Sequence, residues 1–256
     1  MNILITGKTG YLSRALVKFF SNDYTITCIG REDLKLTDRT AVSKWFEGKY
    51  FDVVLHTAIT GGNRMIQEKN SILSTNLQLF FNLLEQKNNY GKFINFGSIA
   101  EHNLHESLYG LSKNIIARYI QEESNFYNLR ICGLFDQNDL DTRFIKSNIN
   151  NYLTGRDQII YSDKYMDFIY MEDLLSIVKF YIESNNIPKT TDCVYSKKYL
   201  LSNIANMINN LNDYKVPIDI RNKTESVSYI GTKCTLPIAF LGLQEGIKRT
   251  YLNLKA

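Results

Sequence analysis

The sequence predicts an α/β fold: a doubly wound parallel sheet followed by a small C-terminal lobe. Three observations predict it. The chain opens with a strand, a glycine turn and a helical pattern; short apolar runs then alternate with amphipathic helical patterns; and this alternation weakens after about residue 135. Strand–helix–strand units are right-handed and stack into a parallel sheet with helices on both faces. Ligands bind such sheets at the carboxyl ends of the strands.

The first element is a short apolar strand at residues 2–6, which Gly7 and Gly10 separate from a helical pattern. The letters Gly-Lys-Thr also close an ATPase phosphate loop, but that loop needs a glycine five positions before Gly7, where this chain has Asn2. A strand, a tight glycine turn and a helix N-terminus instead present N–H groups to a pyrophosphate. We interpret the segment as a dinucleotide loop, although a plain turn explains the glycines alone about equally well. The expected cofactor contacts here are Gly7, Thr9, Gly10, Tyr11 and Leu12.

The remaining elements follow from the spacing of apolar residues. Strands are expected at residues 25–29, 53–56, 92–96 and 128–132. Helices are expected between them at residues 40–46, 66–85 and 108–123. Later in the chain we expect a strand at 158–161 and helices at 141–153, 172–183 and 202–211. The chain is thus expected to form a dinucleotide-binding domain at 1–135 and, at 136–256, a reduced lobe interleaved with the last elements of the sheet.

Composition excludes several classes of function. The chain has 256 residues, 44% of them hydrophobic, which is enough for a full core. Its net charge of +4 is spread without a basic block, so no nucleic acid partner is expected. No apolar stretch reaches the length of a membrane span and the chain does not begin like a secretion signal, so we expect a cytoplasmic protein without a membrane partner. The four cysteines are widely spaced, and no metal site is expected.

Two short stretches carry the chemistry. Tyr109 and Lys113 are four residues apart and share one face of the helix expected at 108–123. A lysine ammonium beside a phenol stabilises the phenolate, which lets the tyrosine exchange a proton with a carbonyl or an alcohol. Ser98 follows the expected strand at 92–96, where its hydroxyl can hold the same carbonyl oxygen. Each feature alone is more often a chance helix pattern or a turn residue, but together, behind a glycine loop, they indicate catalysis.

This combination resembles the extended short-chain dehydrogenase/reductase family, in particular its nucleotide-sugar reductases, epimerases and dehydratases. The loop Thr6-Gly7-x-x-Gly10 and the stretch at 167–174, DFIYMEDL, are similar to family motifs, as is the stretch at 193–208. The resemblance implies a Rossmann-type fold. It also implies that Tyr109 is the general acid/base, that Lys113 lowers its pKa and anchors the ribose, and that Ser98 holds the carbonyl.

The resemblance adds two supporting residues and shows three departures. Ala58 and Asn76 match positions of the family's cofactor site, although a polar residue on an exposed helix face would otherwise explain Asn76. Ser13 replaces the third glycine of the loop, and Met166 stands where the family has an arginine. The chain is also shorter than typical members, with the shortfall in its C-terminal half.

The end of the second strand indicates the cofactor. NAD-selective sites place a carboxylate there to bind the ribose hydroxyls, whereas this chain has Gly30 followed by Arg31. A guanidinium pairs well with a 2′-phosphate, and Lys8 adds positive charge nearby. The sequence therefore predicts NADP(H). The alternative is that Arg31 is a solvated loop residue or pairs with the carboxylates at 32–33.

The residues after Ser98 indicate the reaction. Ile99 and Ala100 replace the acid pair of the family's 4,6-dehydratases, and Ala100 also replaces the cysteine of its epimerase-reductases. No histidine lies beyond position 105, and His102 and His105, which lie between Ser98 and Tyr109, are expected to be loop residues. Residues 57–65 nevertheless resemble the corresponding loop of GDP-fucose synthases, and the stretch LKLTDRTAVSKWF resembles both these and dTDP-4-dehydrorhamnose reductases.

We therefore expect NADPH-dependent reduction of the C4 keto group of a nucleotide-activated deoxysugar, without epimerisation. An NAD-dependent 4-epimerase and a non-catalytic NADP-binding module of the same fold remain alternatives. Arg143 and Lys146 are candidates for the substrate diphosphate, although a solvated helix face explains them equally well. The resemblance suggests a homodimer formed by the helices expected at 66–85 and 108–123.

Overall fold

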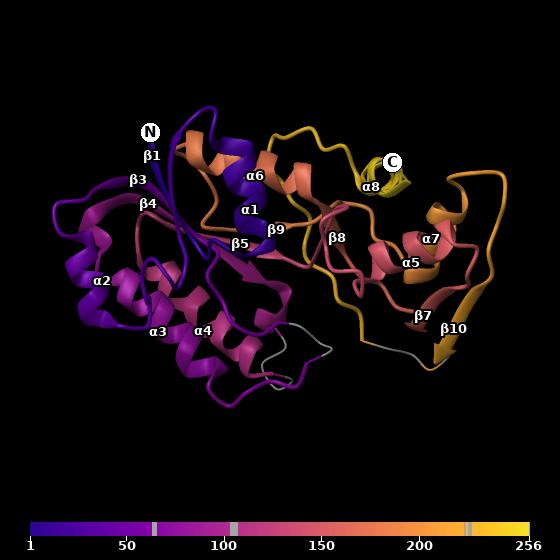
Figure 1. The fold of residues 1–256 in the computed structure, drawn as a ribbon, viewed down its shortest axis with the longest axis horizontal. Coiled ribbons are helices and arrows are strands. Elements are labelled where there is room, and N and C mark those ends of the chain that lie inside the picture. Colours follow the sequence, from indigo (N-terminus) through magenta and orange to yellow (C-terminus); the bar gives the residue numbers. More distant parts are fainter. Residues whose placement is uncertain (63–65, 103–106, 223, 225–226, 256) are drawn as a thin grey trace. The chain divides into compact units, whose positions relative to one another are not determined.

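The computed structural model describes residues 1–62, 66–102, 107–222, 224 and 227–255. The chain forms two compact units (Figure 1). The N-terminal unit comprises Met1–Arg130 and Lys179–Thr191, and the C-terminal unit comprises Ile131–Val178 and Asp192–Ala256. Helix α6 (Met171–Glu183) and strand β9 (Thr190–Cys193) each begin in one unit and end in the other.

The N-terminal unit is built on a six-stranded sheet with the strand order β2-β1-β3-β4-β5-β9. Its first five strands along the chain are β1 (Asn2–Thr6), β2 (Thr25–Ile29), β3 (Phe51–His56), β4 (Tyr90–Ser98) and β5 (Phe126–Ile131). β1 pairs in parallel with both β2 and β3, and β3 pairs in parallel with β4. Because the chain moves from β2 across β1 to β3, the strand order reverses there, and such a switch point opens a crevice at the carboxyl ends of β1 and β3.

Helices cover both faces of this sheet. They are α1 (Tyr11–Phe20), α2 (Arg39–Phe46), α3 (Ile72–Leu84) and α4 (Leu108–Glu122), with short 3₁₀ helices η1 (Lys87–Asn89) and η2 (Ile99–His102) beside β4. Figure 1 shows α2, α3 and α4 together on one side of the strands and α1 on the other. The predicted doubly wound parallel α/β fold is confirmed.

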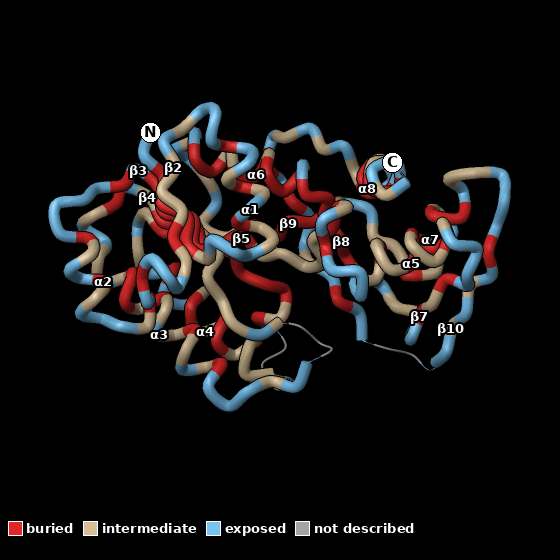
Figure 2. Tube along the Cα trace, viewed as in Figure 1, coloured by how far each residue is buried: buried red, intermediate tan, exposed pale blue. Residues whose placement is uncertain are grey.

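The central strands are apolar on both faces because helices cover both. Ile3, Leu4 and Ile5 of β1 are fully buried, as are the middle residues of β3. Figure 2 shows these strands as buried segments between partly exposed helices. Continuous apolar strands of this kind are typical of parallel sheets, whereas strands with one solvated face alternate. Side chains that are available for chemistry therefore lie at the ends of the strands.

In its described residues, the C-terminal unit contains two small parallel sheets and four helices. β6 (Gly133–Phe135) pairs with β8 (Phe168–Tyr170), and β7 (Gln158–Ser162) pairs with β10 (Ile218–Asn222). The helices are α5 (Phe144–Leu153), α6, α7 (Leu201–Asn209) and α8 (Leu243–Lys255). Apolar residues of α5, α7 and α8 form one core cluster with those of β6 and β8. The short strands β6, β8 and β10 and the helix α8 were not expected from the sequence.

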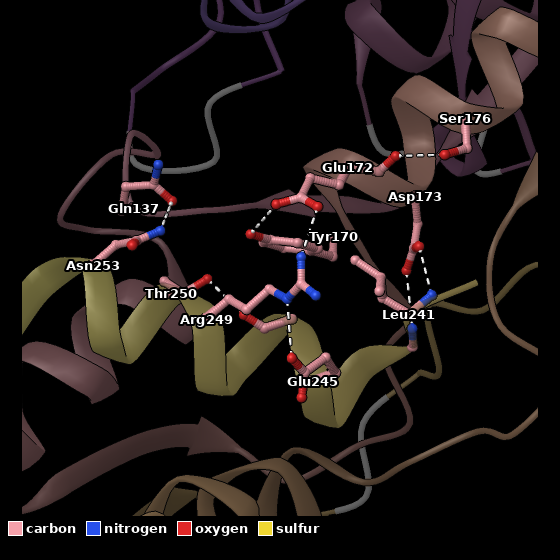
Figure 3. Close-up of polar contacts among 12 residues, drawn as sticks. Gln137, Tyr170, Glu172, Asp173, Ser176, Leu241, Glu245, Arg249, Thr250 and Asn253 are labelled. Carbon is pink, nitrogen blue, oxygen red and sulfur yellow. Dashed lines mark hydrogen bonds and ion pairs between the residues drawn. The ribbon is translucent and has the colours of Figure 1, made fainter. Parts of the chain in front are cut away.

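Polar contacts fasten α8 within this unit (Figure 3). Asp173 accepts hydrogen bonds from the backbone N–H groups of Leu241 (2.8 Å) and Gly242 (3.0 Å), just before α8 begins. Arg249 of α8 donates to Glu172 and to Glu245, both at 2.9 Å. The stretch DFIYMEDL therefore includes two acidic residues whose contacts hold the C-terminal helix.

Two predicted helices begin later than expected. The helix expected at 66–85 starts at Ile72, and the helix expected at 141–153 starts at Phe144. In the first case the preceding chain has another partner, because a carboxylate oxygen of Glu68 accepts the N–H of Leu108 at 2.7 Å, at the start of α4. A carboxylate at that position also interacts favourably with the positive end of the helix dipole. Among the described residues, no helix is both long and apolar enough to cross a membrane.

Candidate active site

The glycine loop between β1 and α1 brings two segments of backbone together. Gly7 has a φ of +79°, and a Cβ on it would lie 2.9 Å from Thr57 Oγ1 and 3.0 Å from the backbone of Ala58. A side chain at Gly10 would lie 3.0 Å from the Gly7 carbonyl. Helix α1 then begins at Tyr11, and no side chain caps it. The loop thus offers bare backbone and a helix N-terminus at the switch point, where a diphosphate could bind.

Residues around this loop are held by local contacts. Ser13, the replacement for the third glycine, is fully buried, and its hydroxyl lies 3.6 Å from Cys28 Sγ of β2. It therefore packs against β2, where a small residue is sufficient. Arg14 donates to the carbonyl of Thr9 at 2.5 Å, which closes the loop on its outer side.

The charges after β2 are arranged around Lys8. Its ammonium lies 3.1 Å from Asp33 Oδ2 and 3.8 Å from Glu32 Oε1. Asp33 also accepts the N–H of Gly30 at 2.9 Å, and these two hydrogen bonds, led by that from Gly30, lower the pKa of Asp33. Both carboxylates therefore contact Lys8, while Arg31 is exposed at the end of the strand.

Asn76 of α3 connects the loop after β3 to α4. Its side chain accepts from the N–H (2.9 Å) and the hydroxyl (3.0 Å) of Thr60 and donates to the Thr60 carbonyl and to Ser112 Oγ, both at 3.0 Å. It is fully buried, so it does not lie on an exposed helix face. Ala58, in the same loop, donates its N–H to Thr6 Oγ1 at 3.1 Å. The predicted pair Ala58 and Asn76 thus fixes the chain that follows β3.

Tyr109 and Lys113 lie one turn apart on α4, as their spacing predicts. The Lys113 ammonium lies 5.8 Å from the centroid of the Tyr109 ring and donates to the carbonyl of Phe96 at 2.5 Å. Lys113 is only 4% exposed, and burial lowers its pKa to about 8, against the opposing effect of the Glu101 charge. The Tyr109 ring has a second close neighbour, since a Cβ at Gly62 would lie 3.0 Å from its Cζ atom.

Ser98 ends β4, two residues after Phe96, whose carbonyl accepts from Lys113. The Ser98 hydroxyl accepts the N–H of Ala100 at 3.2 Å, and its own N–H donates to Glu101 Oε1 at 2.9 Å. His56, which ends β3, is a further buried polar group: burial and the Lys113 charge lower its pKa to about 3, so its imidazole is neutral at physiological pH. Among the residues the sequence singled out, Ser98, Tyr109 and Lys113 all belong to the N-terminal unit.

The structure adds residues that sequence reasoning missed. Glu101 is buried and accepts the N–H of Ser98, Glu68 accepts the N–H of Leu108 at the start of α4, and Gly62 lies close to the Tyr109 ring. For Gly62 a signal was present, because two adjacent glycines follow β3. Glu101 gave none, since a glutamate three residues after a serine is usually solvated.

The remaining candidates occupy other positions. In the C-terminal unit, Arg143 precedes α5, and the ammonium of Lys146 lies 2.7 Å from the carbonyl of Asp139 and 3.0 Å from Asp141 Oδ1. In the N-terminal unit, His102 Nε2 lies 3.0 Å from Arg130 Nη1. His105 lies outside the described residues.

Comparison with known proteins places the fold. No curated protein sequence matches the chain. A GDP-mannoheptose C4 reductase from Campylobacter jejuni, solved with NADP bound, is 17% identical with a TM-score of 0.83, and the match covers 100% of this chain and 98% of that one. A GDP-L-fucose synthetase from Naegleria fowleri is 17% identical with a TM-score of 0.78, covering 98% and 92% of the two chains. A UDP-glucose 4-epimerase from Thermotoga maritima is 15% identical with a TM-score of 0.78, covering 100% and 99%.

At these identities the structural likeness shows a shared fold. The family follows from the sequence itself, because the model of the NAD dependent epimerase/dehydratase family matches residues 3–194. This stretch contains the glycine loop, Ser98, Tyr109 and Lys113, and it agrees with the resemblance found in the sequence. Since the match spans well over half of its length, the chain belongs to the NAD dependent epimerase/dehydratase family.

Proposed function

We propose that this protein catalyses the NADPH-dependent reduction of the C4 keto group of a nucleotide-activated deoxysugar, without epimerisation. One observation carries the proposal: at the end of β4, Ser98 lies beside a helix on which a buried lysine ammonium is 5.8 Å from the centroid of the Tyr109 ring. A phenol next to a buried cation can give up its proton readily, as the reduction of a carbonyl requires.

The residues of the N-terminal unit fit a dinucleotide. Gly7 and Gly10 let the backbone of the loop turn tightly against the chain around it, and the uncapped start of α1 would bind the charge of a diphosphate. Thr9 lies in the same turn, Tyr11 and Leu12 are the first residues of α1, and we assign all three to the cofactor. Lys8 contacts both neighbouring carboxylates, so Arg31 is the cation we assign to the 2′-phosphate of NADP. The Campylobacter reductase of the same fold, solved with NADP bound, supports this choice.

Each residue of the site has its own role in the proposed reaction. When bound, the reduced nicotinamide supplies the hydride. The Tyr109 hydroxyl donates a proton to the carbonyl oxygen, and the Lys113 ammonium stabilises the phenolate that remains. The Ser98 hydroxyl donates a hydrogen bond to the same oxygen, where negative charge develops. Lys113 also donates to the ribose of the cofactor, as its position in the family implies.

The absence of epimerisation rests on residue types. An epimerase-reductase needs a second acid and base to remove and replace protons beside the keto group. Ile99 and Ala100, which follow Ser98, have no such group, and no histidine lies beyond position 105. The substrate diphosphate is assigned to Arg143 and Lys146, with Arg143 the stronger candidate because Lys146 already contacts Asp139 and Asp141.

The protein is also proposed to form a homodimer through α3 and α4. Tyr119 of α4 is 46% exposed and packs edge-to-face against Phe81 of α3, with ring centroids 4.7 Å apart. Such exposed aromatic side chains are enriched at interfaces. Light scattering tests this assignment, and a monomeric mass would contradict it.

The test of the function is NADPH oxidation with freshly prepared GDP- and dTDP-4-keto-6-deoxy sugars. We expect the wild type to consume NADPH with one of them and Tyr109→Phe to lose roughly 10²- to 10⁴-fold in rate, the range for one acid–base group. Tyr50→Phe, which removes a hydroxyl from an exposed tyrosine of the same unit, is the matched control and should retain activity.

Two results would overturn the proposal. If neither sugar is reduced while NADPH binds, the reductase assignment fails. If the protein is purified with NAD bound and interconverts a 4-hydroxy sugar without added reductant, it is a 4-epimerase. For the cofactor, titration should show tighter binding of NADPH than of NADH, and equal affinities would refute the role of Arg31.

A further inference from the structure

A buried glutamate accepts the backbone N–H of the proposed catalytic serine. Glu101, in η2, is 3% exposed. Its Oε1 accepts the N–H of Ser98 at 2.9 Å, and both of its carboxylate oxygens accept from Asn128 Nδ2, at 3.1 and 3.2 Å. Asn114 of α4 donates to the Glu101 carbonyl at 3.0 Å. The carboxylate therefore connects the turn that carries Ser98 to β5, while its backbone is held by the helix that carries Lys113.

The surrounding chain is shaped to admit this carboxylate. A Cβ on Gly97 would lie 2.2 Å from Glu101 Oε1 and 2.5 Å from Asn128 Oδ1, distances that no real Cβ tolerates. Asn95 of β4 donates to Asn128 Oδ1 at 2.7 Å, which turns the amide of Asn128 so that its NH₂ faces the carboxylate. Gly97 thus leaves room for one buried carboxylate, Asn128 donates to it, and Asn95 orients Asn128.

Charged groups face Glu101 from the elements packed around it. Lys113 approaches from α4 and Arg130 from β5, and Arg130 in turn contacts His102 of η2. Burial raises the pKa of Glu101 above its ordinary value, and the hydrogen bonds from Ser98 and Asn128 and the charges of Lys113 and Arg130, which favour the carboxylate, offset part of that rise. Lys113 faces this carboxylate and the neutral His56, and burial is the effect that lowers its pKa.

We propose that Glu101 is a positioning residue for the reduction: it fixes the backbone of Ser98 and supplies the negative charge that keeps the Lys113 ammonium protonated beside Tyr109. The inference rests on the proposed function, in which the tyrosine and the lysine must both carry their protons before hydride transfer. A carboxylate near the pair raises the pH at which the first of these two protons is lost. Whichever group loses that proton, removal of the negative charge makes its release easier.

Glu101→Gln tests the charge and keeps the shape. The amide oxygen can still accept from Ser98, so the turn is retained. We expect the alkaline limb of the pH profile of kcat/KM to move to lower pH by about one unit, the lower end of the effect of a neighbouring charge. Glu122→Gln removes an exposed carboxylate from the end of α4, the helix that carries Lys113, and is the matched control, with no shift expected.

A second variant restores the negative charge on a neighbouring side chain, at position 128. In Glu101→Gln with Asn128→Asp, the glutamine can donate to the new aspartate, which also accepts from Asn95, so each hydrogen bond of the cluster has a counterpart. The alkaline limb should move back toward the wild-type position. If Glu101 has only a structural role, Glu101→Gln would lower kcat at every pH and leave the limb in place, which would overturn the inference.

A third variant gives the opposite sign and does not depend on Glu101→Gln folding. Arg130→Gln removes a cation that faces the carboxylate, so Lys113 should hold its proton more firmly and the limb should move to higher pH. Circular dichroism verifies that each variant is folded. An unmoved limb in folded Arg130→Gln would contradict the charge coupling.

Binding of NADPH separates this inference from the proposed function. Lys113 is assigned to the ribose, so the pH at which NADPH affinity falls should shift in Glu101→Gln as the activity profile does. Fluorescence titration of NADPH measures it without any sugar. If the wild type binds NADPH and reduces neither sugar, the proposed function fails while the binding profile still decides on Glu101. If the sugar is reduced and neither profile shifts, the inference alone fails.

Discussion

The two compact units use buried carboxylates in different ways. In the C-terminal unit, Asp173 accepts from the backbone of Leu241 and Gly242 and from the Tyr195 hydroxyl. Asp167 there accepts from the N–H of Gly231 at 2.9 Å and from the ammonium of Lys198 at 2.5 Å. These acids tie distant loops to the start of a helix or strand. They would do the same in a protein without any catalytic activity.

In the N-terminal unit the buried carboxylate is held by the residues assigned to catalysis. Glu101 accepts from the N–H of Ser98, and its charge acts on Lys113, which lies beside Tyr109. The comparison teaches that burial of an acid does not by itself indicate a site. The difference lies in the roles of the partners: Tyr195 and Lys198, which contact the acids of the C-terminal unit, are assigned no part in the reaction, whereas Ser98 and Lys113 are.

The largest effect is expected from Lys113→Met, on the rate of keto reduction. Removal of the ammonium leaves the Tyr109 phenolate without its neighbouring cation, and we expect the rate of keto reduction to fall roughly 10²- to 10⁴-fold. Steady-state kinetics with NADPH in excess measures it. Lys18→Met, at an exposed position on α1, is the control and should keep full activity. A tenfold loss or less would mean that the cation is not part of the chemistry.

A smaller effect, on stability, is expected from Asp173→Ala. Asp173 is 2% exposed, and its loss leaves two backbone N–H groups and a tyrosine hydroxyl without their acceptor. The free energy of unfolding should fall by about 2–4 kcal/mol, since each buried unsatisfied group costs about 1–3 kcal/mol and relaxation recovers part of it. Urea denaturation measures the change. Asp213→Ala, at an exposed position in the same unit, should change it by less than about 0.5 kcal/mol.

The smallest effect is expected from Arg249→Ala. Its ion pairs with Glu172 and Glu245 lie at the surface, and exposed pairs contribute about 0.2–1 kcal/mol each. We therefore expect a loss in unfolding free energy well below that of Asp173→Ala, and one that diminishes in high salt. A loss as large as that of Asp173→Ala would show that the surface pairs, and not only the buried acid, fasten α8.

Much of the N-terminal unit could be predicted from the sequence. The strand at residues 2–6 was predicted with its observed bounds, because an apolar run that ends in a glycine is an unambiguous local signal. The helix of Tyr109 and Lys113 followed from its apolar spacing. The late start of α3 did not, because Glu68 contacts α4 instead of extending the helix, and that partner lies forty residues away.

The C-terminal unit was harder to predict for physical reasons. β6 and β8 have three residues each, too few to show an alternating pattern, and α8 presents few apolar side chains to its core. The role of Glu101 was also hidden, since its burial depends on the space left by Gly97 and on Asn128 of the next strand. Local patterns identify elements, but they do not show which polar side chains the fold will enclose.

The most direct test of the central claim follows the atoms in the product. NADPH carrying deuterium at its transferable position is used to reduce the active 4-keto sugar, and a second reaction is run with ordinary NADPH in D₂O. NMR then locates deuterium on the sugar ring. The account predicts that the labelled cofactor places deuterium at C4 and that D₂O places none at C3 or C5. Deuterium from solvent at C3 or C5 that depends on the enzyme would contradict reduction without epimerisation, and its absence from C4 in the first reaction would contradict hydride transfer to that carbon.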